Sequence, residues 1–396
     1  MTKTPTLTRT SRGKRYPRVL GSLGGVRPGP TFVVIGGIHG NEPGGAEAVL
    51  RVVEALRELE PSFRGRFLGL AGNLAALECR RRYLDQDLNR VWAAESVASL
   101  RAQEPERDSF EQKEQRELIA VLDDLLDKHD DVLVLDLHSS SAAGAPFSCM
   151  GDTIRNRRIA FALPIPVILG LEEAIDGGFL DWVYRRGHVA VAVEGGRHGE
   201  VRTVENLESA LWLSLVAAGC LLANEVPDIE LHRRRLSNAT AGIPSVIEIR
   251  HREKLVLEDT FEMVGDREYR SFDVVHKGTL VARRNGRDVL APETGRLLLP
   301  LYQGQGSDGF FIGRRVRPFW LALSKWLRRI RFSRTLLLLL PGVHRHPTLP
   351  DAFVVDPRIA RTKPVEVFHL LGFRRRRWED GKLVFTRRNE GTPRVL

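Results

Sequence analysis

A histidine and a glutamate stand three residues apart in GGIHGNEPGG (residues 36–45), as His39 and Glu42. The pair follows an apolar run, TFVVIGGI (31–38), and precedes a helical pattern. At this spacing an imidazole and a carboxylate can converge on one metal ion, and the flanking glycines let the backbone approach closely. An alternative is a turn in which Glu42 only interacts with the helix dipole. The segment matches neither GxxxxGK[ST] nor GxGxxG, which excludes these phosphate-binding motifs.

A second histidine, His138, ends the apolar run DVLVLDLH (131–138). On its own it is equally compatible with a hydrogen-bonded structural histidine. Because ligand sites in open α/β sheets lie at the carboxyl ends of the strands, we expect His138 near His39 and Glu42. Two histidines and a carboxylate are a common ligand set of catalytic zinc, which keeps one position for water. Asp136, on the same strand face, can orient a ligand imidazole or serve only the structure.

A third polar strand end is Glu194 in HVAVAVEGG (188–196). An acid that follows small and apolar residues and precedes two glycines is poorly explained as a solvated charge. Near a zinc-bound water it can act as general base and then pass the proton to the leaving group. The alternative is a loop or helix-capping carboxylate.

The segment CRRRYLDQDLNRVW (79–92) combines Arg82, Asn89 and Arg90 with Asp85 and Asp87. Guanidinium and amide groups are multidentate donors suited to a carboxylate, and the two aspartates would neutralise and orient the guanidiniums. The same composition also occurs in a surface charge run, so spacing alone does not decide between the two.

Alternating strand and helix patterns must position these residues. Continuous apolar runs at 31–38, 65–72, 131–138, 165–170 and 188–196 predict strands covered on both faces. Apolar residues at three- and four-residue spacing predict helices at 42–60, 111–129 and 205–223. The fold class is therefore α/β, a mixed and largely parallel sheet flanked by helices.

The chain divides by texture into a basic N-terminal arm (1–30), a domain that carries the candidate zinc site (31–226), a linker (227–245), a small β-domain (246–313) and a basic extension (314–396). RRNGRD (283–288) predicts a hairpin in the β-domain, and Asp-Gly in FRRRRWEDGKLVFTRR (373–388) predicts another in the extension.

Charge is distributed unevenly over the 396 residues, whose net charge is +10. Residues 19–313 hold 34 basic and 44 acidic residues, whereas residues 314–396 hold 20 basic and 6 acidic ones. The basic character therefore belongs to the ends, and the acidic body gives no reason to expect nucleic-acid binding. Three widely spaced cysteines exclude a disulfide framework, and no uncharged apolar run of 18 residues exists. We expect a cytoplasmic protein.

Together these motifs resemble the succinylglutamate desuccinylase/aspartoacylase family, a branch of the zinc carboxypeptidase-like hydrolases. The resemblance rests on HGNE (39–42), RRYLDQDLNR (81–90), LDLH (135–138), VEGG (193–196) and APETGRLLLPLYQGQGSDGFFIG (291–313), the last similar to the family's C-terminal β-domain. It spans roughly residues 31–314.

The resemblance implies a role for each motif. His39, Glu42 and His138 would bind one Zn²⁺ per chain, with Glu194 as general base. Arg82 would polarise the scissile carbonyl. Asn89, Arg90 and Tyr302 would contact the substrate, although Tyr302 in LPLYQGQG is also compatible with core packing. Asp136 would orient a ligand imidazole, and Asp87 would orient the guanidiniums.

One departure from the family concerns FLDWVYRRGHVAVAVEGG (179–196). Aspartoacylase-like members use an arginine in this stretch to hold the acyl carboxylate. Here Tyr184 stands about where that arginine is expected, with Arg185 and Arg186 beside it. Either another residue takes the role or the substrate lacks that carboxylate.

We therefore predict a zinc-dependent hydrolase that cleaves an amide or ester in a small anionic substrate such as an N-acyl amino acid. The alternatives are a zinc carboxypeptidase or cell-wall amidase, and a non-catalytic binding protein whose basic tail holds membrane or nucleic acid. The sequence leaves open a homo-oligomer and the role of the extension, whose Trp- and Arg-rich start could lie at an anionic membrane interface.

Overall fold

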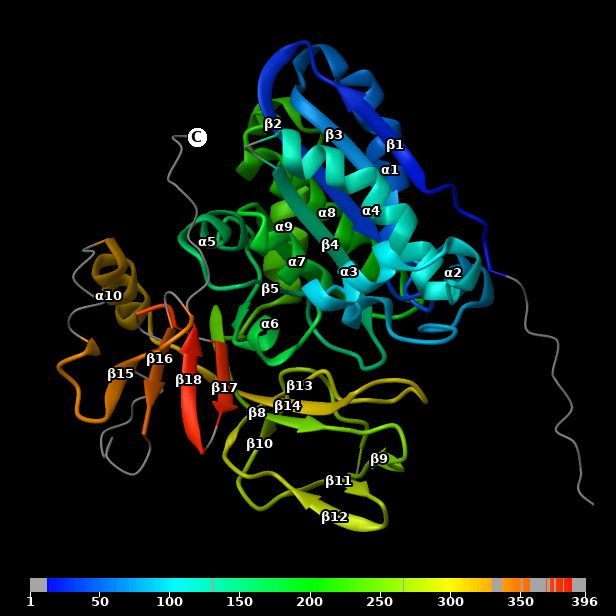
Figure 1. Cartoon of the computed structure of the whole chain (residues 1–396). Helices are drawn as coiled ribbons and strands as arrows, with labels where there is room; N and C mark the ends of the chain where they lie inside the picture. Colours follow the sequence, from blue (N-terminus) through cyan, green and yellow to red (C-terminus); the bar gives the residue numbers. More distant parts are fainter. Residues whose placement is uncertain are drawn as a thin grey trace, which may run out of the picture.

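The computed structural model describes residues 13–129, 132–265, 267–329, 337–349, 352–356, 368, 371–373, 375–379 and 381–386. Its largest element in these ranges is one mixed sheet of eleven strands (Figure 1). The strands, in order across the sheet, are β1 (Val19–Gly24), β3 (Arg64–Ala71), β2 (Arg27–Gly36), β4 (Val132–Ser140), β7 (Val189–Arg197), β5 (Phe147–Cys149), β6 (Val167–Leu169), β8 (Val246–Lys254), β14 (Asp308–Arg315), β13 (Gly295–Leu298) and β10 (Val274–Val275).

The central strands β3, β2, β4 and β7 run parallel, and the outer strands add antiparallel pairs. This confirms the predicted class, a largely parallel central sheet flanked by helices. The helices of the body are α1 (Gly44–Glu58), α2 (Leu74–Cys79), α3 (Ala94–Ala102), α4 (Phe110–Lys128), α5 (Ile154–Ala160), α6 (Leu171–Ala174), α7 (Phe179–Arg185), α8 (Val201–Ala218) and α9 (Ile229–Ala239), with short 3₁₀ turns η1 (Glu60–Ser62), η2 (Leu88–Arg90), η3 (Pro105–Arg107) and η4 (Ala223–Glu225).

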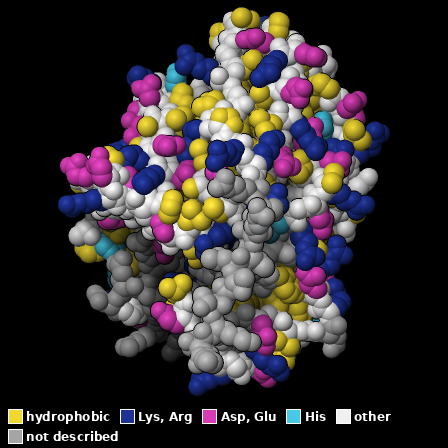
Figure 2. All heavy atoms as spheres, turned by 90° about the vertical axis from the view of Figure 1, so that its right-hand side faces the viewer, with side chains coloured by type: hydrophobic (Ala, Val, Ile, Leu, Met, Phe, Trp, Pro, Cys, Tyr) yellow, Lys and Arg dark blue, Asp and Glu magenta, His cyan; other side chains and the backbone are white. Residues whose placement is uncertain are grey.

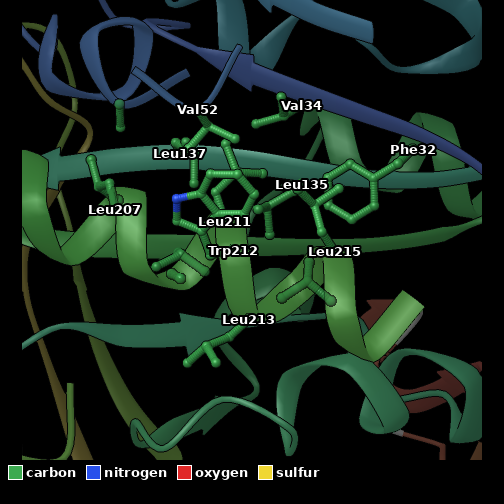
Figure 3. Close-up of a cluster of buried hydrophobic side chains, with 14 of the residues drawn as sticks. Phe32, Val34, Val52, Leu135, Leu137, Leu207, Leu211, Trp212, Leu213 and Leu215 are labelled. Atoms are coloured by element: carbon green, nitrogen blue, oxygen red, sulfur yellow. The ribbon is translucent and has the colours of Figure 1, made fainter. Parts of the chain in front are cut away.

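Two hydrophobic layers hold the sheet between its helices. Successive residues of a strand point to opposite faces. On β2, Phe32 and Val34 accordingly pack with α1 and α8, whereas Val33 and Ile35 pack with α4 and α7. Figure 3 shows the first layer, where side chains of α8 such as Trp212 lie against those of β2 and β4. Burial on both faces explains why these strands are continuous apolar runs.

The region predicted as a small β-domain is joined to the main sheet. β8 pairs in parallel with β6, and β14 then pairs with β8, so the sheet continues without a break into this region. A separate three-stranded sheet is formed by β12 (Arg287–Leu290), β11 (Leu280–Arg284) and β9 (Phe261–Met263). β11 and β12 form the predicted hairpin, with Asn285 and Gly286 at φ of 52° and 72° as a tight turn requires.

Two expected connecting segments contain regular structure. The linker predicted over 227–245 contains α9, because His232 and Leu236, four residues apart, are buried on one face of a helix. His232 packs against Trp212 of α8. Its neighbours Arg233, Arg234 and Arg235 obscure this pattern in the sequence. Likewise, within the expected N-terminal arm, residues 19–24 form β1 at the edge of the main sheet, and residues 1–12 lie outside the described residues.

The extension contains α10 (Pro318–Arg329) and a four-stranded antiparallel sheet. The strand order is β15 (Val343–Arg345), β16 (Ala352–Val355), β18 (Lys382–Thr386) and β17 (Arg375–Glu379). β17 and β18 form the second predicted hairpin. None of the described helices combines the length and apolarity needed to cross a membrane. Cys79, Cys149 and Cys220 are free thiols.

Candidate metal centre

His39 and Glu42 lie in the turn between β2 and α1. The Glu42 N–H donates to the His39 carbonyl oxygen over 3.0 Å, which closes this turn. The helix begins directly against the sheet because Gly36 ends β2: a Cβ at that position would lie 2.3 Å from the Ala46 nitrogen. The glycines around the motif therefore serve the close approach of helix and strand.

The two remaining members of the predicted set come from adjacent strands. β4 and β7 are parallel, and their register places His138 beside Glu194. β4 also pairs with β2, which leads to His39 and Glu42. The carboxyl ends of three neighbouring strands thus bring together residues that are far apart in sequence.

The Glu42 carboxylate stands between the two imidazoles. Its Oε1 lies 2.8 Å from His39 Nδ1, and its Oε2 lies 3.1 Å from His138 Nδ1. One ligand atom from each of the three residues lies within 4.8 Å of the other two, and all three side chains are buried. This is a set of donor atoms that one ion can bridge.

Each imidazole has a second carboxylate on its far side. His39 Nε2 lies 3.2 Å from Asp87 Oδ1, and His138 Nε2 lies 2.9 Å from Asp136 Oδ2. Because a carboxylate accepts hydrogen bonds, each aspartate favours the tautomer protonated at Nε2. The Nδ1 lone pair then remains on the side of Glu42, the arrangement that metal-binding histidines require.

The electrostatics of the cluster reflect burial opposed by close partners. Burial favours the neutral carboxyl of Glu42, but the two imidazoles hold its pKa well below the usual range. Burial also disfavours the charged form of His138, yet Asp136 and Glu42 keep the pKa of this imidazole well above its usual value. Burial and then repulsion from Glu42 raise the pKa of Glu194 to about 8. Glu194 Oε2 is buried without a hydrogen-bond partner among the described residues.

Arg82 is held beside this cluster by Asp87. The Arg82 Nε and Nη2 groups donate to Asp87 Oδ2 over 3.2 and 3.0 Å, and Nη1 lies 3.5 Å from Glu42 Oε1. Asp87 thus joins the guanidinium to the imidazole of His39. The contact of Asp87 with the arginine is predicted from the sequence, whereas its contact with the histidine is not.

A buried glutamate shapes the loop that carries Arg82 and Asp87. Glu111, in the first turn of α4, accepts backbone N–H groups of Leu84, Asp85 and Gln86 over 2.7–3.2 Å. It also accepts from Asn73 Nδ2 over 3.0 Å. Its side chain satisfies backbone donors that a buried loop would otherwise leave unpaired. From the sequence, Glu111 is predicted only to begin a helix.

A cavity opens over the cluster. Its lining includes His39, Glu42, Arg82, Asn89, Arg90, His138 and Glu194 from the predicted set, together with Ser139, Cys149, Glu172, Gln303 and Asp308, which were not predicted. Arg90 Nη2 lies 3.3 Å from Asp308 Oδ2, and Arg252 Nε donates to the other carboxylate oxygen over 2.5 Å. Asn89 Oδ1 accepts the Phe179 N–H over 2.8 Å, which leaves the Asn89 NH₂ group as the possible donor to a ligand.

Comparison with known proteins finds a family whose catalytic domain is similar to this part of the chain. Residues 28–207 match the model of the succinylglutamate desuccinylase/aspartoacylase catalytic domain. The match covers somewhat less than half of the chain, and within it residues 28–207 carry the pattern of that catalytic domain.

Individual relatives match over limited segments. The chain is 45% identical over 61 residues to a succinylglutamate desuccinylase of Erwinia tasmaniensis, covering 15% of this chain and 18% of that protein. It is 31% identical over 164 residues to a probable aspartoacylase of Parasynechococcus marenigrum, covering 37% and 48%. The matched segments thus span less than half of either relative. The structure of a succinylglutamate desuccinylase/aspartoacylase from Rhodobacter sphaeroides is similar with a TM-score of 0.54 at 19% identity, covering 76% of this chain and 88% of that chain, which shows a shared fold.

The three residues that depart from the family, Tyr184, Arg185 and Arg186, do not reach the cavity. Tyr184 is buried, and its hydroxyl accepts the Gly151 N–H and donates to the Ala190 carbonyl oxygen, both over 2.8 Å. Arg185 pairs with Asp181, and Arg186 lies over the Trp182 ring at 4.0 Å. In the described part of the chain, none of Tyr184, Arg185 and Arg186 lines the cavity.

Tyr302 also lies away from the cavity lining as described. Its hydroxyl accepts the Tyr269 N–H over 2.7 Å, and its own N–H donates to Ser141 Oγ over 3.0 Å. The neighbouring Gln303 lines the cavity instead and accepts from Asn41 Nδ2 over 2.7 Å. A substrate contact by Tyr302 therefore stays a prediction of the family resemblance alone.

The donor set fits a divalent cation. Glu42, Asp87, Asp136 and Glu194 place four buried or nearly buried carboxyl groups around two imidazoles and the Arg82 guanidinium. Burying anions is costly unless cations pair with them. The raised pKa of Glu194 reflects this excess of negative charge, because repulsion from Glu42 contributes to it. His39, Glu42 and His138 are the residues that can hold such an ion.

Proposed function

We propose that the protein is a zinc-dependent hydrolase that cleaves the amide bond of a small N-acyl amino acid. The observation that carries the proposal is the buried His39, Glu42 and His138 cluster with Glu194 beside it and two arginines in the same cavity. The match of residues 28–207 to the catalytic domain of that family supports a hydrolase of this type.

A zinc ion held by His39, Glu42 and His138 would supply Lewis acidity, polarising the scissile carbonyl and lowering the pKa of a water molecule. Glu194 accepts the proton as this water attacks the carbonyl carbon. It then protonates the nitrogen as the carbon–nitrogen bond breaks, so that a carboxylate and an amine leave. The unpartnered Glu194 Oε2 supports this role because no competing hydrogen bond in the described structure holds it.

The two arginines take different tasks. Arg82, fixed by Asp87, stabilises negative charge that develops on the carbonyl oxygen. Arg90 pairs with Asp308 through a single 3.3 Å contact and so keeps donors for a substrate carboxylate. The Asn89 NH₂ group lies in the same cavity and adds a donor there.

Metal analysis and an activity screen test the proposal. Purified protein is expected to contain one zinc ion per chain, and His39→Ala or His138→Ala should abolish its binding. The matched control is His232→Ala, which removes a buried histidine that contacts Ser209 outside the cavity. The zinc-loaded protein is then assayed against N-acyl amino acids that differ in the acyl group and in the amino acid.

Each outcome of the screen has a distinct meaning. Amide cleavage that chelation removes and zinc restores supports the proposal. Full hydrolysis by metal-free protein would refute the mechanism. Hydrolysis of peptides with C-terminal residues, without cleavage of N-acyl amino acids, would indicate a carboxypeptidase instead.

A further inference from the structure

Helix α10 exposes three aromatic side chains to solvent and buries two polar ones against the protein. Residues three, four and seven apart lie on one side of a helix. Ser324 and Arg328, four apart, are only 3% and 4% exposed, whereas Phe319 and Trp326, seven apart, are 66% and 59% exposed. A helix at the surface of a globular protein normally buries its large apolar side chains and exposes its polar ones.

The buried face is fixed by directional bonds. Arg328 donates to the Asp152 carboxylate over 2.7 Å and to the Asp152 carbonyl oxygen over 2.8 Å. Arg157 donates to the same carboxylate, from Nε to Asp152 Oδ1 over 2.6 Å. Its Nη2 also donates to Ser324 Oγ over 3.3 Å. Leu321 packs on the core of the body. Rolling the helix would break this Arg157–Asp152–Arg328 clamp, so the aromatic face must point outward.

The outward face is aromatic and has no acidic neighbour in the sequence. Phe319 and Trp320 rings lie 5.4 Å apart, and Trp320 is 49% exposed. No aspartate or glutamate occurs between Asp308 and Asp351. Four cations near the helix, Arg314, Arg315, Arg317 and Lys325, are exposed.

This composition differs from other parts of the surface. On the face of the molecule shown in Figure 2, basic and acidic side chains are interspersed. An acidic body with 44 acidic and 34 basic residues would be repelled by an anionic bilayer. The segment around α10 is a basic part of the chain, and its charge is complementary to such a surface.

We infer that α10 docks the protein on an anionic phospholipid surface, lying in the plane of the interface with Phe319, Trp320 and Trp326 inserted among the headgroups. In the described residues α10 comprises twelve residues, fewer than the about 20 that a bilayer-spanning helix needs. Tryptophan and phenylalanine beside basic residues are the side chains that interfacial helices use.

Vesicle co-sedimentation of the full chain tests the inference. Wild-type protein should bind vesicles of phosphatidylcholine mixed with phosphatidylglycerol, bind phosphatidylcholine alone much less, and lose binding as salt is raised. The double variant Phe319→Ser/Trp326→Ser should reduce binding more than about tenfold because two apolar anchors are lost. Arg314→Gln should reduce binding about fivefold, as expected for one cation near the surface.

Leu257→Ser is the matched control, since it removes a side chain that is 91% exposed and lies between β8 and β9. It should leave binding unchanged, and the thermal unfolding and zinc content of all variants should match wild type. Binding that is absent, equal for both lipid compositions, or unaffected by the double variant would overturn the inference. A dimer in size-exclusion chromatography that the double variant dissociates would also overturn it, because a second copy would then cover the face.

Discussion

Two clusters of buried charge in the molecule are built differently. In the Arg157–Asp152–Arg328 clamp, one carboxylate is bonded by two guanidiniums. Around His39 and His138, the four carboxyl groups of Glu42, Asp87, Asp136 and Glu194 face one guanidinium, that of Arg82, and an oxygen of Glu194 has no described partner. Both clusters are buried to a similar degree.

The difference indicates what each cluster is for. A buried charge with its counter-charge already in place fixes one packing arrangement, because removing either partner leaves an unpaired ion. A buried excess of negative charge lacks a partner within the chain, which suits a site that receives a cation from outside. The predictions below test this contrast.

The largest effect is expected at Glu194. Glu194→Gln keeps the shape and a possible acceptor but cannot take a proton. We expect kcat to fall by about 10²–10⁴-fold while zinc content is unchanged. Steady-state kinetics on the substrate found in the screen, together with metal analysis, measure the two effects. Glu172→Gln, which changes another carboxyl of the same cavity, is the control; an equal loss there would show that cavity charge, rather than proton transfer, is responsible.

The clamp should respond in stability rather than in metal binding. Arg328→Met removes the charge and keeps most of the volume. We expect the free energy of unfolding to fall by about 3 kcal/mol, at the lower end for a broken buried pair because Arg157 still binds Asp152. Chemical denaturation measures this change. Lys325→Met, on the exposed side of the same helix, should change it by less than about 0.5 kcal/mol. If the two variants behaved alike, α10 would not be held by the clamp.

The sequence identifies the metal cluster better than it identifies the clamp, for a physical reason. His39 and Glu42 share one turn, and His138 and Glu194 end apolar runs, so sheet topology alone brings them to one edge. The family resemblance points to the same positions. The two buried strand layers were predicted for a similar reason, since burial on both faces leaves a continuous apolar run.

Contacts between distant loops are not visible in such patterns. The bond between Asp87 and His39 depends on how Glu111 folds the 84–86 backbone, and the lining by Gln303 and Asp308 depends on the junction of β8 with β6. In the sequence Arg328 cannot be distinguished from the other residues of a basic run, because its partner Asp152 lies 176 residues earlier in the chain. Tyr184 similarly points inward to Gly151 and Ala190, a direction that the sequence of α7 does not specify.

A smaller effect is expected where a carboxylate only supports a metal ligand. Asp136→Asn keeps the shape beside His138 Nε2 but removes the charge that fixes the imidazole tautomer. We expect zinc affinity to fall by about 10–100-fold, measured by competition with a chromogenic chelator. Asp152→Asn makes the same chemical change in the clamp and should leave zinc affinity unchanged. Equal losses in both variants would mean that global stability, not the orientation of His138, sets the affinity.

The smallest effect is expected for an ion pair near the surface, that of Arg64 and Glu225. Like the clamp, it joins a carboxylate to a guanidinium. Arg64 Nη1 lies 2.8 Å from Glu225 Oε2, and hydrogen bonds from Arg64 and the Leu222 N–H lower the pKa of Glu225 from 4.5 to about 2. A depressed carboxyl pKa contributes stability above the unfolded value, and this contribution is lost as the pH falls from 4.5 towards 2. The melting temperatures of wild type and Glu225→Gln should therefore differ slightly at neutral pH, and the difference should shrink as the pH falls through this window. In high salt the difference at neutral pH should be smaller, because salt screens exposed ion pairs. A difference that stays constant down to the lowest pH would show that Glu225 stabilises η4 through its backbone contact rather than through its charge.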